Sequence, residues 1–169
     1  MSGRDKLMLA SGSLIFVAGG PGVMALLTVW GGQVTFLPEL TFTYGFSVFA
    51  CAFGLFFAAW SVYEMLTKGE GGPAVLGPVK LMQETRHLVT TGPYALCRNP
   101  MHLGIILYFL GFACYLNSLW ALAVPLAMTV FAFSLAVFVD EPRLKRDFPE
   151  EYAAWASRVP RFLPNVRRS

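Results

Sequence analysis

The sequence predicts an all-α, polytopic membrane protein with about four transmembrane helices, of which the last two form a tight hairpin. Its composition supports this class, since 56% of the 169 residues are hydrophobic and only 14% are charged, whereas soluble domains usually carry about a quarter charged residues. Its uncharged stretches are long enough to cross a bilayer, and its cations gather where one topology places them all on one face. We therefore expect a single membrane domain over residues 1–169, without a separate soluble domain.

The first span is expected at about residues 7–30, within a stretch that has no charge from Leu7 to Pro38. This stretch is longer than the apolar core of a typical signal peptide, which favours a retained span over a cleaved leader. The Gly-Gly-Pro-Gly sequence at 19–22 should kink this helix or break it locally.

The second span is expected at about residues 43–66, and the third and fourth at about 100–116 and 119–139. The last two come from the uncharged stretch 99–139, which as one helix would be about 60 Å long, twice the hydrocarbon thickness. Polar turn residues in "LNSLW" (116–120) favour a helical hairpin instead.

The cations predict the orientation. All 13 Lys and Arg residues fall in three segments: two precede the first span, four lie between residues 67 and 99, and seven follow residue 142. The loop at 31–42 and the turn at 116–119 carry none. Four spans with both termini in the cytoplasm therefore satisfy the positive-inside rule. The compact chain suggests a bacterial inner membrane.

The tail beyond the fourth span is amphipathic. Its apolar residues recur at spacings of four, four, three and four positions and form one helical face: Leu144, Phe148, Tyr152, Trp155 and Val159. This pattern predicts short cytoplasmic helices over about 142–159 that lie at the membrane interface and cover what is beneath them.

The two hairpin helices are expected to bring opposite charges together. Asn99 and Pro100 form a helix start with Asn as the N-cap, and its free N–H groups beside Arg98 would attract a carboxylate or phosphate. The fourth span is expected to end at Asp140 and Glu141, where the negative helix end would attract an ammonium or another cation. Since the hairpin turn is short, these two ends should be neighbours.

Such a site, next to the open backbone and aromatic ring of Gly92-Pro93-Tyr94, suits a zwitterionic, amino-acid-like ligand that carries a base. S-adenosylmethionine is one such molecule, but the phosphates of a nucleotide could also use Arg98 and the helix N-terminus. In a simpler alternative, Arg98 contacts lipid headgroups, and the two carboxylates pair with Arg143 or Lys145.

No metal or nucleic-acid partner is expected. The two histidines have no cysteine or carboxylate cluster nearby, and Cys51, Cys97 and Cys114 form no CxxC pair.

Two separated motifs resemble those of a known family. "HLVTTGPYALCRNPMHLG" (87–104) resembles the pattern LVxxGPYxxxRHPxYxG, and "DEPRLKRDFPEEYAAWASRVPRFLP" (140–164) resembles EEPxLxxxFGxxYxxYxxxVPRxxP. Together they are similar to the isoprenylcysteine carboxyl methyltransferase and phospholipid N-methyltransferase family of integral membrane methyltransferases. The resemblance covers roughly the C-terminal half of the chain.

The resemblance implies a small multi-span enzyme that binds S-adenosylmethionine from the cytoplasm through the loop 67–99 and takes a lipid or other lipophilic acceptor from the membrane. That acceptor would be a phospholipid amine, or the carboxylate or thiol of a small apolar or isoprenyl-cysteine-like molecule. Carried over position by position, the motifs imply these cofactor-binding residues: His87, Leu88, Val89, Gly92, Tyr94, Arg98, Asn99, Pro100, His102, Gly104, Asp140 and Glu141.

The chain departs from the family patterns at several positions. Asn99 replaces the His of the motif, His102 its Tyr, Asp140 its first Glu and Pro149 a Gly. Asn99 can still cap and donate a hydrogen bond but cannot act as a base, whereas His102 gains a titratable nitrogen. These changes leave the acceptor open.

An amine or thiol acceptor needs a base, and the sequence offers two catalytic candidates. Glu64 is an ionisable group at the end of an apolar span, which makes it a functional candidate. Its alternative role is an ion pair with Lys68 one turn later. His102 is the second candidate, and its alternative role is a satisfied histidine at a helix start.

Two other functions compete with methyl transfer. Membrane reductases of the sterol-reductase type end in a similar hairpin and bind NADPH, but they need more spans, and Asp140 and Glu141 would suit the nucleotide's phosphates poorly. A non-catalytic four-span membrane protein would bind neither cofactor.

Overall fold

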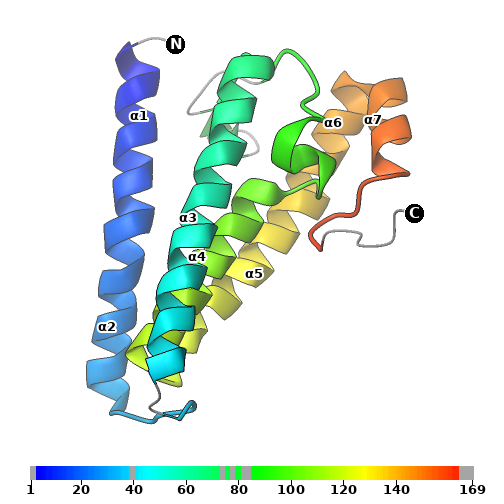
Figure 1. The fold of residues 1–169 in the computed structure, drawn as a ribbon. Helices are drawn as coiled ribbons and strands as arrows, with labels where there is room; N and C mark the ends of the chain where they lie inside the picture. Colours follow the sequence, from blue (N-terminus) through cyan, green and yellow to red (C-terminus); the bar gives the residue numbers. More distant parts are fainter. Residues whose placement is uncertain (1–2, 39–40, 73–74, 77–78, 81–84, 164–169) are drawn as a thin grey trace. The chain divides into compact units, whose positions relative to one another are not determined.

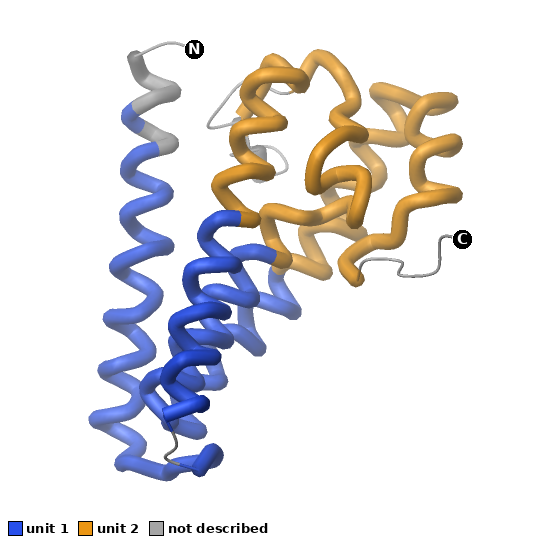
Figure 2. Tube along the Cα trace, viewed as in Figure 1, with its two compact units in different colours: residues 1–56, 104–131 blue, residues 57–103, 132–169 orange. Residues whose placement is uncertain are grey.

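The computed structural model describes residues 3–38, 41–72, 75–76, 79–80 and 85–163 of the chain. Within these residues the secondary structure is helical, except for an antiparallel pair of two-residue strands, β1 (Val75–Leu76) and β2 (Val79–Lys80). Figure 1 shows the elements in chain order. The chain divides into two compact units (Figure 2): unit 1 comprises Met1–Phe56 with Gly104–Phe131, and unit 2 comprises Phe57–Leu103 with Ala132–Ser169.

The first helix of unit 1 is continuous but irregular. It consists of α1 (Gly3–Leu14), one π-helical turn η1 (Ile15–Gly19) and α2 (Gly20–Gly31). The expected irregularity before Pro21 is thus a π turn rather than a break. The Tyr108 hydroxyl donates a hydrogen bond to the Val17 carbonyl at 2.9 Å, which satisfies an oxygen within the turn.

Glycines allow the helices of unit 1 to approach closely. A Cβ on Gly20 would overlap the ring of Phe109. On α3 (Thr41–Lys68), a Cβ at Gly54 would lie 2.5 Å from the backbone nitrogen of Tyr108 and 2.6 Å from the Gly104 carbonyl. Gly104 therefore packs against α3. This is not the cofactor contact that was expected for it.

The expected hairpin turn is confirmed. α4 runs from Pro100 to Leu116, and the chain becomes helical again in η3 (Trp120–Leu122) and α5 (Ala123–Leu135). Asn117 takes a positive φ of 46°, a conformation that Asn tolerates better than most residues. Its side chain accepts from the N–H groups of Phe36 and Leu37 at 3.2 and 2.9 Å and donates to the Leu37 carbonyl at 2.9 Å.

Three helical segments are long and apolar enough to cross a membrane: Ala10–Gly31, Thr41–Lys68 and Trp120–Asp147. The helix expected as the third span has the expected bounds, but its 17 residues measure about 25 Å, slightly less than the hydrocarbon thickness of about 30 Å. Membrane crossing by α4 stays a prediction.

The helix expected to end at Asp140 does not end there, and this expectation was wrong. α5 continues through a π-helical turn, η4 (Ala136–Asp140), into α6 (Glu141–Asp147). In that turn the Glu141 N–H donates to the Ala136 carbonyl. The wider turn precedes Pro142, whose missing N–H would otherwise interrupt the regular ladder. Asp140 and Glu141 therefore lie within a helix, and the negative helix end is one to two turns away.

The amphipathic tail packs inside unit 2. α7 runs from Pro149 to Ala156, and the predicted apolar face contacts the loop before α4: Tyr152, Trp155 and Val159 form a buried cluster with Val89 and Tyr94, and Leu144 and Phe148 pack against it. The apolar face of the tail thus covers other residues of unit 2. The same face cannot also lie on the membrane interface.

Candidate functional site

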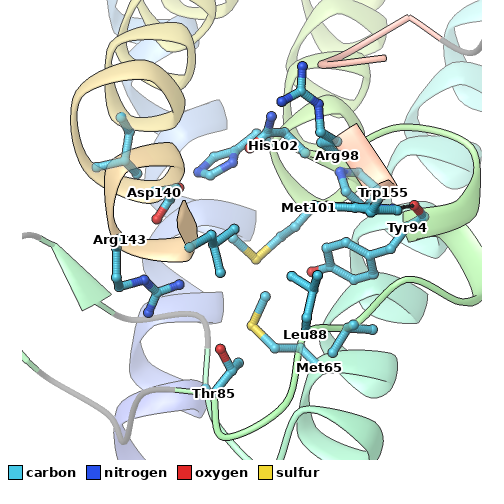
Figure 3. Close-up of a pocket in the computed structure, with 16 residues that line it drawn as sticks. Met65, Thr85, Leu88, Tyr94, Arg98, Met101, His102, Asp140, Arg143 and Trp155 are labelled. Atoms are coloured by element: carbon cyan, nitrogen blue, oxygen red, sulfur yellow. Dashed lines mark hydrogen bonds between the residues drawn. The ribbon is translucent and has the colours of Figure 1, made fainter. Parts of the chain in front are cut away.

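Unit 2 contains a pocket lined by residues from five of its segments (Figure 3). These are the end of α3 with Gly72 after it, the loop 85–99, the first turn of α4, the helix from Leu135 to Leu144, and α7. Eight of the predicted cofactor residues line it: Leu88, Val89, Tyr94, Arg98, Asn99, Pro100, His102 and Asp140. The predicted loop and helix start thus lie along one pocket, and their binding of a cofactor stays a prediction.

Arg98 and Glu141 are in direct contact, as the predicted meeting of the two helix ends requires. Arg98 Nη1 lies 3.2 Å from Glu141 Oε1 and donates to the Tyr152 hydroxyl at 2.7 Å. Arg161 binds the other side of the carboxylate, with Nη2 at 3.1 Å from Oε2. Glu141 is therefore buried between two guanidinium groups. We refer to these residues as the Arg98–Glu141–Arg161 cluster.

The cluster changes the expected role of both charges. In Figure 3 the Arg98 guanidinium points away from the other side chains drawn, toward the glutamate partner that neutralises it. Glu141 does not line the pocket, because both of its oxygens are bound by Arg161. The two residues expected to face a zwitterion from opposite poles face each other.

Asn99 holds the C-terminal segment as well as starting α4. Its backbone N–H and its side-chain Nδ2 both donate to the Arg161 carbonyl, at 3.1 and 3.0 Å, and the Arg98 N–H donates to the Pro160 carbonyl at 2.8 Å. The described contact of the Asn99 side chain is thus with the chain segment after α7, and not with the first turn of its own helix.

Asp140 and Arg143 line the pocket from one helical face, and Arg98, which also lines it, is bound to Glu141. Asp140 and Arg143 are three positions apart, a spacing that places both on the same face of a helix, and both are pocket residues. Arg143 Nε is buried and has no hydrogen-bond partner within the described part of the chain. Arg143 was expected only as a partner for the carboxylates, although its spacing from Asp140 places it on the same helical face.

Aromatic and thioether groups form the rest of the wall. In Figure 3 Tyr94 and Trp155 lie on one side of the pocket, Asp140 and Arg143 on the other, and Met65 and Met101 between them. The Trp155 Nε1 donates to the Tyr94 carbonyl at 3.1 Å. Burial raises the pKa of Tyr94 above its ordinary value, so its hydroxyl stays protonated at neutral pH. Neither methionine nor Trp155 was among the predicted site residues.

The remaining predicted residues lie outside the pocket lining. His87 is exposed and Gly92 forms the turn before Tyr94 with a φ of +59°. Glu64 is bound to Lys68 at 2.8 Å, as its alternative role predicted. His102 is therefore the one of the two candidate bases that lines the pocket. Of the described residues, no group of three or more His, Cys, Asp and Glu side chains could hold a metal ion.

The family model for phospholipid methyltransferases (PEMT) matches residues 42–151 of the chain. Among curated proteins, the cobalt-zinc-cadmium resistance protein CzcN of Cupriavidus metallidurans is 34% identical over 79 residues, which are 47% of this chain and 36% of that protein. Protein-S-isoprenylcysteine O-methyltransferase B of Arabidopsis thaliana is 32% identical over 90 residues, 52% of this chain and 45% of that protein. The chain thus matches less than half the length of each of these relatives.

A solved structure shares the fold. The eukaryotic intramembrane Ras methyltransferase ICMT (isoprenylcysteine carboxyl methyltransferase) aligns with a TM-score of 0.64 at 18% sequence identity, over 98% of this chain and 55% of that chain. This match confirms the expected all-α, polytopic membrane fold.

Proposed function

Because the chain belongs to the phospholipid methyltransferase family, as its two motifs indicated, we propose that it is a membrane methyltransferase that uses S-adenosylmethionine to methylate a lipophilic acceptor. The names of its relatives support this chemistry, since one curated relative and one structural relative are isoprenylcysteine methyltransferases. The acceptor is a lipid-like molecule that reaches the pocket from the membrane. Both termini lie in the cytoplasm, according to the distribution of Lys and Arg.

The observation that carries this proposal is the pairing of Asp140 and Arg143 on one wall of the pocket in unit 2. A zwitterionic amino acid group needs an anion to bind its ammonium and a cation to bind its carboxylate. Arg143 suits the carboxylate because its buried Nε has no partner among the residues described, and a buried donor without a partner is costly. Asp140 provides the complementary charge one helical turn earlier.

The opposite wall fits the other parts of the cofactor. The rings of Tyr94 and Trp155 offer an aromatic face to a planar base and to a sulfonium cation. The thioethers of Met65 and Met101 provide a polarizable apolar surface. A nucleotide with several phosphates fits less well, because the Asp140 carboxylate would repel its phosphates.

When bound, S-adenosylmethionine supplies an electrophilic methyl group on a sulfonium. The residues of the chain then have to orient the acceptor, exclude water and remove a proton from a protonated acceptor. We propose that a ring nitrogen of His102 accepts this proton. His102 lines the pocket in the first turn of α4. Glu64 is a weaker candidate because its carboxylate is held by Lys68 and Thr91.

Calorimetric titration of the detergent-purified protein tests the cofactor. We expect binding of S-adenosylmethionine and S-adenosylhomocysteine, and none of NADPH. Binding of NADPH alone would favour the reductase alternative, and binding of neither would favour a non-catalytic membrane protein. Incubation with methyl-labelled cofactor and a total lipid extract, followed by identification of the labelled product, then distinguishes a phospholipid amine from a carboxylate or thiol acceptor.

A further inference from the structure

Near the end of α3, the Glu64 carboxylate contacts the side chains of Lys68 and Thr91. Its Oε2 accepts a hydrogen bond from the Thr91 hydroxyl at 2.8 Å and lies 2.8 Å from the Lys68 ammonium. Lys68 Nζ also donates to the Thr91 hydroxyl oxygen at 2.9 Å. The three groups form a closed triangle in which the hydroxyl donates to the carboxylate and accepts from the ammonium. The Glu64 side chain is only 9% exposed.

Glu64 also contacts the residue after Thr91. Gly92 has a φ of +59°, and a Cβ at this position would lie 2.8 Å from Glu64 Cδ and 3.0 Å from its Oε1. The carboxylate therefore packs directly against the Gly92 backbone. A larger residue at position 92 is disfavoured for two reasons. The backbone has a left-handed conformation, and a Cβ would overlap the Glu64 carboxylate.

This turn determines where Tyr94 lies. The Tyr94 N–H donates to the Thr91 carbonyl at 3.1 Å, which starts the 3₁₀ helix η2 (Gly92–Ala95). The Tyr94 carbonyl accepts from Trp155 Nε1 at 3.1 Å. Tyr94 is thus fixed at one end by the turn that Glu64 holds and at the other by an aromatic residue of α7. The residue is 6% exposed and lines the pocket.

From these contacts we infer that Glu64 is a positioning residue, which together with Lys68 holds the Thr91–Gly92 turn and so presents Tyr94 to the cofactor. The inference rests on the proposed function for the identity of the ligand. A general base must reach the proton that it removes, and Glu64 lies outside the pocket lining with its Oε2 already bound. Its influence on the ligand therefore passes through Thr91, Gly92 and Tyr94.

Glu64→Gln tests this role in the full-length protein, because glutamine still accepts from Thr91 but no longer attracts Lys68. We expect amide hydrogen exchange in residues 91–97 of the ligand-free protein to become faster, and the Kd for S-adenosylhomocysteine to rise about tenfold, as for the loss of one charged contact. The rate of methyl transfer at saturating cofactor should stay within about threefold of the wild-type rate. Thr91→Val should weaken binding similarly, and the double variant should be no weaker than either single one, because the residues act as a unit.

Glu70→Gln is the matched control. It makes the same change six residues later, just after α3, at a carboxylate that is 54% exposed and paired loosely with Arg86 at 3.6 Å. We expect it to change neither exchange nor affinity.

Three results would overturn the inference. Unchanged exchange in Glu64→Gln would show that the carboxylate does not hold the turn. Faster exchange with unchanged affinity would limit Glu64 to a structural role. A rate at saturating cofactor that falls about a hundredfold with unchanged affinity would identify Glu64 as a base. If the wild-type protein binds neither S-adenosyl compound, the proposed function fails, whereas the exchange measurement still reports whether Glu64 holds the turn.

Discussion

Arg98 Nη1 and Glu141 Oε1 lie 3.2 Å apart although the residues are 43 positions apart in the chain. The contact joins the segment before α4 to the start of α6, and Arg161 closes it from the side of the C-terminal segment. The side chains of Arg98 and Glu141 are 15% and 11% exposed. Removing one partner would therefore leave the opposite charge largely buried.

We expect Glu141→Ala to lower the free energy of unfolding by about 3 kcal/mol, as for other broken buried ion pairs. Thermal unfolding in detergent, followed by circular dichroism, measures this change. Arg146→Ala is the control, because its pair with Asp147 is surface-exposed (72% for Arg146) and should contribute less than about 1 kcal/mol. Equal losses of unfolding free energy in both variants would contradict a stabilising role of the Arg98–Glu141–Arg161 cluster.

Arg143→Gln should weaken S-adenosylmethionine binding at least tenfold, because a hydrogen bond between charged groups contributes about 1.5–3 kcal/mol. The melting temperature should change little, since Arg143 Nε has no partner in the described part of the ligand-free protein. Calorimetry and thermal unfolding measure the two quantities. Arg146→Gln, on the same helix but outside the pocket lining, should bind as wild type does, and equal binding by Arg143→Gln would argue against the proposed charge pair.

His102→Gln should reduce the rate at saturating cofactor by about 10²–10⁴, the usual contribution of a positioned acid or base. Its Kd for S-adenosylhomocysteine should stay within about threefold of wild type. His87→Gln is the matched control, because His87 is exposed and lies outside the pocket lining. An unchanged rate of methyl transfer in His102→Gln would mean that another group accepts the proton or that the acceptor needs no base.

Gly20→Ala should destabilise unit 1 by about 1–3 kcal/mol, the usual cost of overpacking, because the new methyl group would overlap the Phe109 ring. Gly22→Ala places the same group two residues later, where nothing lies within 4 Å, and should be neutral or slightly stabilising through helix propensity. Thermal unfolding of the two variants measures the difference. Similar melting temperatures would mean that the helix and Phe109 are not in tight contact.

Cys97 should resist alkylation in the folded protein. It is fully buried, and burial raises its pKa from the ordinary value of 9.0 to about 11. The thiolate, which is the reactive form, is therefore scarce at pH 8. In a Cys51→Ser, Cys114→Ser background, maleimide should label the unfolded protein and leave the folded one unmodified. Rapid labelling of the folded protein would contradict this burial.

The same shift predicts a pH dependence of stability. Because the unfolded thiol ionises near pH 9 and the folded one only near 11, the unfolded state loses its proton first. The contribution of Cys97 to stability is therefore complete below pH 9 and falls as the pH rises from 9 to about 11. Cys97→Ala in the same background should remove this part of the pH dependence of the melting temperature.

Local sequence signals were sufficient for the presence of the helices and for several of their boundaries. Asn99-Pro100 correctly marked the start of α4, and Asn117 the turn after it, because helix starts and tight turns depend on a few neighbouring residues. The spacing of apolar residues from Leu144 to Val159 correctly predicted one buried face. Hydropathy identified the long apolar segments, since the bilayer acts on each segment separately.

The partners of the charged side chains depended on packing between distant segments. Glu64 binds Thr91 across 27 positions, and Glu141 binds Arg161 across 20, distances over which no local periodicity applies. The helix continues through the π turn at Ala136–Asp140 and past the end expected at Asp140 and Glu141. Arg98 Nη1 is bound to Glu141, and Arg143 lines the pocket together with Arg98. The sequence by itself thus determined which segments form helices. Only the tertiary structure determined which charged side chains are available to a ligand, because a buried charge pairs with the partner that packing brings next to it.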